Sequence, residues 1–258
     1  MSKRHFRTSL KILKVLTAIL LAGITYLFAI KLARRSHSLP ARAAWLKQQA
    51  RRFLWALGVE PSYVGAPPPN GLLISNHISY VDILVHAAHT PLVFISKAEV
   101  AHWPVFGALS RWAGTLFIRR ELRSDVLRVA AQMPPVIDAG VILAFFPEGT
   151  SSDGSGVLPF RASLLAPLVD NGWHVTPAFL QYDLEPGDGE VAEEVAYYRP
   201  ETEFGPHLLN LLGKQRIRAR LTYGIQEPCC GDRKMLATQL RGKVCALGGI
   251  VEEPTLLN

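Results

Sequence analysis

Residues 71–88 read GLLISNHISYVDILVHAA, an apolar run at 72–75 followed at once by a helical stretch at 80–88. A short apolar run bounded by a turn is typical of a buried strand, and a helix directly after it is typical of a sheet whose strands alternate with helices. The turn between them carries asparagine, histidine and serine, and an aspartate opens the helix. This stretch therefore predicts a buried strand with polar side chains at its end.

The same alternation continues along most of the chain from residue 71 onward. The strand-like runs are residues 72–75, 92–96, 115–118, 141–146, 174–179 and 217–223, and the helical stretches include 80–88, 124–139, 159–169 and 232–247. Two adjacent prolines, Pro134 and Pro135, must break or kink the second of these helices. The pattern predicts a single α/β domain in which helices flank a mainly buried mixed sheet.

The N-terminal region predicts a membrane-anchoring helix before this domain. Residues 15–30 are uncharged and mostly apolar, and basic residues flank them on both sides. Because the run is shorter than the ~20 residues of a perpendicular span, we expect either a short transmembrane anchor with snorkelling lysines or a helix that lies in one leaflet. A cleaved signal peptide is the alternative, but no small-x-small cleavage site follows the run. The basic flanks leave the orientation open.

A second helical pattern at residues 41–57 predicts an amphipathic helix. Its apolar residues recur at helical spacing among basic ones, and Trp45 and Trp55 accompany them. Such a helix suits the lipid interface, where each cation near an anionic surface contributes ~1 kcal/mol, and it also suits packing on the core. Three prolines and an asparagine at 67–70 form a break. We predict an anchor in 1–40, an amphipathic helix with a proline-rich linker in 41–70, and the main domain in 71–258.

The composition favours anionic partners. The 258 residues are 49% hydrophobic and 19% charged, with a net charge of +7. This balance suits nucleic acid, an anionic membrane or a phosphorylated substrate, but nucleic acid would not explain the apolar anchor, so we expect none. Cys229, Cys230 and Cys245 are too few and too badly spaced for a disulfide framework or a metal site. We therefore expect no metal and a reducing compartment, with the body on the cytoplasmic side of the inner membrane.

His77 and Asp82 are the first candidates for chemistry. A histidine at a strand end with a carboxylate nearby is suited to act as a base, because the carboxylate fixes the tautomer and stabilises the imidazolium. Five residues along a helix turn by about 140°, so the side chains meet only if His77 lies in the turn before the helix. An N-cap at Asn76 or Ser79 would place it there. Taken alone, the pair is also compatible with a capping histidine and a solvated aspartate.

Adjacent arginines follow the strand-like run at 115–118. The guanidinium groups of Arg119 and Arg120 suit the geometry of a phosphate or carboxylate, and the end of a strand in an α/β sheet is where ligands usually lie. A solvated basic face has the same pattern. The pair therefore predicts an anion site only in combination with other segments.

Two further segments carry a proline at or within a strand. Residues 146–150, FPEGT, end a strand and leave Glu148 at the sheet edge, while Gly149 allows close approach of the backbone. A plain turn is the alternative. Pro177 lies inside the run 174–179 and predicts a strand edge or the wall of an entry, although a purely structural role is also open.

Together and in this order, these segments resemble the glycerolipid acyltransferase family that includes the 1-acylglycerol-3-phosphate acyltransferases. The resemblance covers about residues 41–245. The first motif of the family, asparagine-histidine, four residues and aspartate, is matched by Asn76, His77 and Asp82, and its third motif by FPEGT at 146–150. Four ordered segments are a more specific signal than any one of them.

The resemblance implies a role for each matched residue. It implies that His77 is the base and that Asp82 orients it. A head-group site for the acceptor is implied at Arg119, Arg120, Glu148, Gly149 and Thr150, with Arg161 as a further basic residue, and Pro177 lines the acyl or acceptor cleft. Family members often have an acidic residue at the position of Arg119, and this departure leaves the preferred head group open.

The implied reaction transfers a fatty acyl group from acyl-CoA or acyl carrier protein to the free hydroxyl of a lysolipid, with no cofactor. A lipid hydroxyl is a poor nucleophile at neutral pH, so a histidine within ~3 Å takes its proton, which contributes ~10²–10⁴-fold. No acyl-enzyme is required, and Cys229 and Cys230 have no base nearby in the sequence.

We expect lysophosphatidate as the acceptor, in phospholipid biosynthesis. A lyso-ornithine lipid or another lysophospholipid is the alternative within this chemistry, because the turn at 150–154 resembles both branches. A membrane lipid-binding protein on an inactive acyltransferase fold is the alternative from another class. It would lack His77 or Asp82, and both residues are present.

Overall fold

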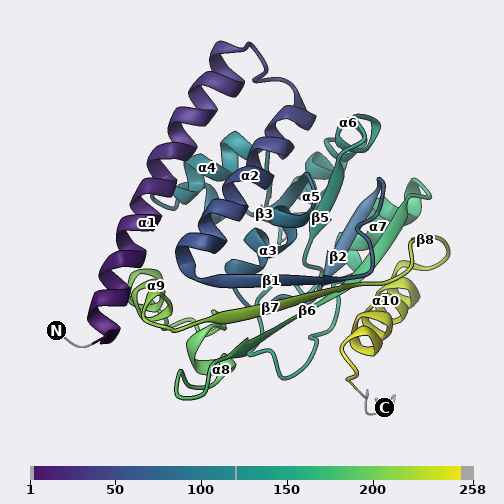
Figure 1. Cartoon of the computed structure of the whole chain (residues 1–258). Helices are drawn as coiled ribbons and strands as arrows, with labels where there is room; N and C mark the ends of the chain where they lie inside the picture. The colour runs from purple at the N-terminus through teal and green to yellow at the C-terminus, as the bar shows by residue number, and fades with distance from the viewer. Residues whose placement is uncertain (1–2, 120, 251–258) are drawn as a thin grey trace.

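The computed structural model describes residues 3–119 and 121–250, which are organised around an eight-stranded sheet (Figure 1). The strands follow the order β1-β7-β6-β2-β5-β3-β4, and β8 pairs with β6. They are β1 (Val59–Val64), β2 (Leu72–Ser75), β3 (Leu92–Lys97), β4 (Leu116–Ile118), β5 (Ile142–Phe145), β6 (His174–Leu184), β7 (Ile217–Tyr223) and β8 (Glu227–Pro228). Strand β6 runs antiparallel to β7 and β8, and the other pairs are parallel. The predicted mixed α/β fold is confirmed.

Helices cover both faces of this sheet. They are α1 (Lys3–Tyr26), α2 (Leu39–Leu57), α3 (Val81–His89), α4 (Phe106–Ala113), α5 (Arg123–Ala130), α6 (Met133–Asp138), α7 (Ala162–Asp170), α8 (Val191–Glu194), α9 (Phe204–Leu212) and α10 (Arg233–Leu247), with a π-helical segment η1 (Leu27–Leu32) and a 3₁₀ turn η2 (Ala98–His102). Side chains alternate between the faces of a strand. Accordingly, Leu73 of β2 packs with α2, α3 and α9, whereas Leu72 and Ile74 pack with α6, α7 and α10.

The parallel strands bring their carboxyl ends to one edge of the sheet. Strands β2, β5 and β3 are neighbours, and the turns after β2 and β5 carry His77 and Glu148. Ligands of open α/β sheets bind outside this edge. The topology therefore places the candidate residues where a site is expected.

Strand β1 lies in the segment that the sequence assigned to a linker. It pairs with β7 from Val59 to Val64 at the edge of the sheet. An edge strand tolerates a charged residue and a proline, and Glu60 and Pro61 hide this strand in the sequence. Residues 59–64 therefore belong to the sheet and not to the linker.

Strand β6 corrects the interpretation of Pro177 as a strand edge. It is an interior strand with β2 on one side and β7 and β8 on the other. The proline is accommodated because position 177 falls between the residues that pair with β8, 174 and 175, and those that pair with β7, which begin at 178. Its carbonyl accepts the N–H of Gly224 at 2.8 Å.

The predicted helix at 124–139 is two helices. Helix α5 ends at Ala130, and α6 begins at Met133 with a proline in its first turn. Proline is tolerated there because the first N–H groups of a helix have no partner within it. The expected break is confirmed, whereas α4, α8 and α9 were not predicted.

Helix α1 continues into η1 as one apolar segment, Arg4–Leu32, whose best window has a mean hydropathy of 2.1. By length and composition it is able to cross a membrane. In this structure it lies along α2 and passes beside α9 (Figure 1). In its first half, Nζ of Lys11 donates to the carbonyls of Leu57 at 2.7 Å and Lys214 at 3.0 Å. The helix is thus tied to the body over much of its length.

Helix α2 packs on the core, one of the two placements that its sequence allowed. Ala50 and Leu54 are buried in the core, and the indole of Trp45 is buried against Tyr26 and Trp112. Trp55 is 64% exposed. Only part of this helix therefore remains free to face a lipid interface.

Candidate active site

His77 and Asp82 form a hydrogen-bonded pair at the carboxyl end of β2. Nδ1 of His77 lies 2.7 Å from Oδ2 of Asp82. Asp82 is fully buried, and the His77 side chain is 20% exposed. Helix α3 begins at Val81, so His77 stands in the turn before the helix, as the spacing required. An ionised carboxylate only accepts, so Nδ1 carries the proton and Nε2 is left as an acceptor.

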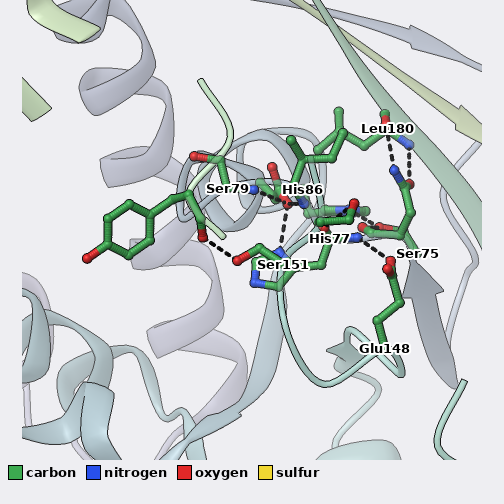
Figure 2. A network of polar contacts seen from close by, with 12 residues as sticks. Ser75, His77, Ser79, His86, Glu148, Ser151 and Leu180 are labelled. Carbon is green, nitrogen blue, oxygen red and sulfur yellow. Dashed lines mark hydrogen bonds and ion pairs between the residues drawn. The ribbon is translucent and has the colours of Figure 1, made fainter. Parts of the chain in front are cut away.

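The turn that carries His77 is anchored to neighbouring segments. The buried side-chain amide of Asn76 donates to the carbonyl of Leu180 at 2.8 Å and accepts its N–H at 2.7 Å, which extends the pairing between β2 and β6. The N–H of Ser152 donates to the His77 carbonyl at 2.8 Å. Figure 2 shows these contacts around His77, with Leu180 and Glu148 on either side. Asn76 therefore holds the turn from the sheet and is not an N-cap.

Asp82, in the first turn of α3, holds the same turn from the helix side. Its Oδ2 accepts from the N–H groups of Ile78 at 2.7 Å and Ser79 at 3.0 Å as well as from His77. Its Oδ1 accepts from the hydroxyl of Tyr182 at 2.7 Å. Four donors thus hold this buried carboxylate in place.

Glu148 lies behind His77 and does not open into the cleft. Its Oε1 accepts the His77 N–H at 2.7 Å, and its Oε2 accepts the Leu158 N–H at 2.9 Å. The residue is 3% exposed. Burial raises the pKa of Glu148 to about 8, against the two backbone donors, which lower it. The sequence predicted a contact between Glu148 and the head group. In the structure, both carboxylate oxygens instead accept hydrogen bonds from backbone N–H groups.

The imidazole of His77 is also fixed by ring contacts. It stacks on Phe146, with centroids 4.1 Å apart and planes 4° apart. A second histidine, His86, is buried one helical turn beyond Asp82, and its Nε2 lies 2.9 Å from Oγ of Ser75. Burial lowers the pKa of His86 to about 4, so it is neutral at physiological pH. His77 is therefore the histidine of this cluster that faces solvent.

A cleft of about 440 Å³ opens beside His77. The turn after β5 forms one wall with Gly149, Thr150 and Ser151, and Lys97 and Arg199 are its cations. Gly149 has a φ of 76°, a left-handed conformation that favours glycine. Gly149 and Thr150 thus lie where the sequence placed them, next to the candidate base.

An apolar cavity of about 110 Å³ adjoins this cleft. Tyr80, Phe94 and Trp103 line both spaces. Away from the cleft, the cavity is lined by residues of α2, such as Leu46, and by Val15 of α1. A chain of CH₂ groups suits such a space, because each buried CH₂ contributes about 0.8 kcal/mol.

The predicted basic residues differ in where they lie. The Arg119 side chain is mostly exposed and reaches Asp125, with Nη2 3.4 Å from Oδ1. Arg120 lies outside the described residues. Nε of Arg161 donates to the Glu148 carbonyl at 3.3 Å, just behind the cleft wall. Pro177 is buried in β6 and does not belong to the lining of the cleft or the adjoining cavity.

Three residues at this site were not predicted. Lys97 follows the predicted strand at 92–96, and its place at a strand end was a signal of the kind used for the arginines. Tyr182 on β6 and Arg199 in the loop after α8 both follow His77 by more than 100 positions in the sequence. No pattern in the residues around them marks them as part of the site. Within residues 3–119 and 121–250, no group of three His, Cys, Asp or Glu residues is arranged to hold a metal.

Comparison with known proteins agrees with this geometry. The Acyltransferase family model matches residues 63–181, from β1 into β6. A lyso-ornithine lipid O-acyltransferase of Rhodobacter capsulatus is 34% identical over 207 residues, which are 77% of this chain and 73% of that protein. This chain belongs to the acyltransferase family. The match includes His77, Asp82 and residues 146–150, and Tyr182 lies just beyond it.

Other members of the acyltransferase family are similar over different lengths. A lyso-ornithine lipid O-acyltransferase of Pseudomonas aeruginosa is 33% identical over 80% of this chain and 78% of its own length. A 1-acyl-sn-glycerol-3-phosphate acyltransferase of Neisseria meningitidis is 37% identical over 132 residues, so the match spans about half of each protein, 51% and 52%. The solved structure of a 1-acyl-sn-glycerophosphate acyltransferase from Thermotoga maritima has the same fold, with a TM-score of 0.69, 19% identity and coverage of 97% and 98%.

Proposed function

We propose that this acyltransferase moves a fatty acyl group from a thioester donor, acyl-CoA or acyl carrier protein, to the free hydroxyl of a lysolipid. The observation that carries the proposal is the His77–Asp82 pair at the wall of a cleft that adjoins an apolar cavity. The pair provides a base, the cleft accommodates a polar head group, and the cavity accommodates an alkyl chain.

In the proposed reaction, Nε2 of His77 takes the proton of the acceptor hydroxyl as its oxygen attacks the thioester carbonyl. A carbon–oxygen bond forms and a tetrahedral intermediate results. The carbon–sulfur bond then breaks, and the thiolate leaves and receives the proton from His77. Asp82 holds the imidazole in the required tautomer and stabilises the imidazolium between the two proton transfers.

The developing oxyanion requires donors close to His77. In the turn after β5, the N–H of Gly149 bonds the Phe146 carbonyl, and that of Ser152 bonds the His77 carbonyl. Among the described contacts, the N–H groups of Thr150 and Ser151 in this turn have no acceptor assigned. We place the oxyanion at these two N–H groups, where preorganised donors are most effective.

The substrates divide between the two adjoining spaces. The acyl chain of the donor enters the apolar cavity, with Tyr80, Phe94 and Trp103 at its mouth. Lys97 and Arg199 provide cationic groups for the acceptor head group, with Arg119, Arg120 and Arg161 as the basic residues implied by sequence. Glu148 acts on the reaction by fixing the backbone of His77.

The mode of membrane association follows from the apolar N-terminal helix. Its outward face carries a row of exposed apolar residues, among them Leu13, Leu16 and Leu20, whereas Ala18 and Ala22 are buried against the body. Because the body lies along the helix, we propose that α1 lies in one leaflet, on the cytoplasmic side of the inner membrane, and holds the cleft at the surface.

Lysophosphatidate is the proposed acceptor, because Lys97 and Arg199 line the cleft and suit its phosphate once it replaces Glu99 and Glu193, the carboxylates that pair with them. A lyso-ornithine lipid is the second candidate. Similarity to the lyso-ornithine lipid acyltransferases extends over up to 80% of this chain, against 51% for the Neisseria proteins. The carboxylate of a lyso-ornithine lipid would also pair with Lys97 and Arg199.

The proposal is tested by acyl transfer in membranes that contain the protein, with lysophosphatidate and lyso-ornithine lipid offered side by side. Labelled acyl-CoA and acyl carrier protein serve as alternative donors, and His77→Ala is the control. We expect His77-dependent transfer to lysophosphatidate. Preference for the lyso-ornithine acceptor would reassign the head group, and a lack of His77-dependent transfer to either acceptor from both donors would contradict the proposal.

A further inference from the structure

The buried carboxylate of Asp82 has one oxygen that does not face His77. Oδ2 holds the imidazole and two backbone N–H groups, whereas Oδ1 accepts from the hydroxyl of Tyr182 at 2.7 Å. Among the contacts of the described residues, Tyr182 is the one donor to Oδ1. Asp82 is fully buried and Tyr182 is 6% exposed, so this hydrogen bond is shielded from solvent.

We infer that Tyr182 is a positioning residue for acyl transfer, because its hydroxyl holds Asp82 and limits how strongly that carboxylate draws a proton onto His77. The inference rests on the proposed function, since it requires His77 to act as the base. Tyr182 touches Asp82 and not the reacting atoms, so it acts through the pair.

The sheet explains why Tyr182 is suited to this role. It stands on interior strand β6, opposite Ala219 of β7, while His77 and Asp82 come from the turn after β2 and from α3. The same turn is already joined to β6 by Asn76 and Leu180. Burial and the charge of Asp82 raise the pKa of Tyr182 well above 10, so its hydroxyl keeps its proton and remains a donor.

Loss of this hydroxyl changes the charge balance of the pair. In Tyr182→Phe the ring remains, but Oδ1 of Asp82 becomes a buried acceptor without a donor. Its negative charge is then less compensated, which favours the imidazolium form of His77. The base is therefore protonated at a higher pH than in the unmodified protein.

The test compares the pH dependence of kcat/KM for three enzymes, the unmodified protein, Tyr182→Phe and Tyr223→Phe. We expect the acid limb of the profile to move up by roughly 0.5–1 pH unit in Tyr182→Phe, from the strength of a hydrogen bond to a charged group. Tyr223 is the matched control. It lies on the neighbouring strand β7 and is also 6% exposed, and its hydroxyl bonds His89 of α3 at 3.0 Å. We expect no shift in the control.

A double-mutant cycle separates positioning from packing. If Tyr182 acts through Asp82, adding Tyr182→Phe to Asp82→Asn produces much less than its effect in the unmodified protein. An equal factor of loss in kcat/KM in both backgrounds would overturn the inference. An acid limb of the pH profile that stays in place in Tyr182→Phe would also overturn it.

A second replacement, with the opposite expected effect on the acid limb, tests the inference even if Tyr182→Phe does not fold. 3-Fluorotyrosine at position 182 keeps the ring and strengthens the donor, so the acid limb moves to lower pH. If the acid limb is unchanged with this residue while transfer still requires His77, the role of Tyr182 is overturned and the proposed function stands. Transfer that does not require His77 would remove the proposed function and this inference together.

Discussion

At the scale of single residues, the site depends on buried groups that hold His77 from several directions. Asp82 fixes the ring, Phe146 stacks on it, and Asn76 and Glu148 fix its backbone. A base held on all sides needs little reorganisation when a substrate binds, which is the basis of catalysis by orientation. Among the contacts of the described residues, its Nε2 has no partner and is available to the acceptor hydroxyl.

Glu148 gives a prediction about stability and pH. Its pKa is raised from 4.5 to about 8 by burial, so between these values the folded protein binds a proton that the unfolded chain releases. Stability contributed by this group is therefore present below about pH 4.5 and is lost as pH rises towards 8.

We expect the free energy of unfolding of the unmodified protein, relative to Glu148→Gln, to fall over that pH range by a few kcal/mol, as an order of magnitude. Urea unfolding in detergent at several pH values measures it, with the exposed Glu201→Gln as the control. A difference between the unmodified protein and Glu148→Gln that does not change with pH would contradict the assignment.

Residue-level prediction from sequence succeeded where contacts are local. The pairing of His77 with Asp82 followed from five residues of spacing and a turn before the helix. The contact between Asp82 and Tyr182 joins residues 100 positions apart, and no pattern around Tyr182 marks it. The sequence predicted a head-group contact for Glu148, whereas its carboxylate is buried against backbone N–H groups. Burial of this kind cannot be predicted from a short motif.

At the scale of elements, helix α2 connects the apolar helix α1 to the proposed acyl cavity. Its Leu46 lines the cavity and not the cleft, so a larger side chain there reduces the space for an acyl chain without entering the cleft. We expect Leu46→Trp to shift donor preference towards shorter acyl chains, with transfer from short donors retained.

Competition among acyl-CoA donors of different lengths measures this preference. Leu209→Trp on α9 is the control, because Leu209 is 53% exposed and lies outside the lining of the cavity. Equal chain-length profiles for Leu46→Trp and the unmodified protein would place the acyl chain elsewhere.

Strands with apolar or regularly alternating sequences were predictable, whereas the edge strand β1 was not. Strands β2 and β7 match their expected ranges, because buried strands are apolar throughout or alternate regularly. Strand β1 contains Glu60 and Pro61, which its position at the edge of the sheet accommodates and which hide the apolar pattern of a strand. The order of strands and the interior position of β6 depend on long-range pairing that local patterns do not encode.

At the scale of the whole molecule, the N-terminal helix is connected to the cleft through helix α2 and the apolar cavity. Helix α1 packs along α2, α2 lines the apolar cavity, and the cavity adjoins the cleft with His77. A lipid acceptor drawn from the leaflet would thus meet the base without leaving the membrane surface. The alternation of strands and helices predicted the layers, whereas the way α1 lies against the body required the structure.

The outward face of α1 predicts how the protein is attached. Leu16 and Leu20 are 58% and 63% exposed, and burial of each leucine in lipid contributes about 1.5–3 kcal/mol. We expect the double change of Leu16 and Leu20 to glutamine to weaken flotation with lipid vesicles by at least roughly tenfold. The melting temperature should stay the same, since the inward face of α1 is unaltered.

Ala18→Val, on the inward face, is the comparison for this prediction. It should affect the melting temperature and not flotation, because Ala18 is buried against the body. Full retention of vesicle binding by the double variant would mean that another surface carries the attachment.

If His77 is the base of the acyl transfer, single-turnover transfer from labelled acyl-CoA by His77→Ala shows it directly. His174→Ala is the matched control, since His174 is exposed at the opposite, amino-terminal end of β6. We predict that His77→Ala loses transfer by roughly 10²–10⁴-fold while its fold and membrane binding persist, and that His174→Ala transfers at the normal rate. Transfer by His77→Ala at the rate of the unmodified protein would show that His77 is not the base.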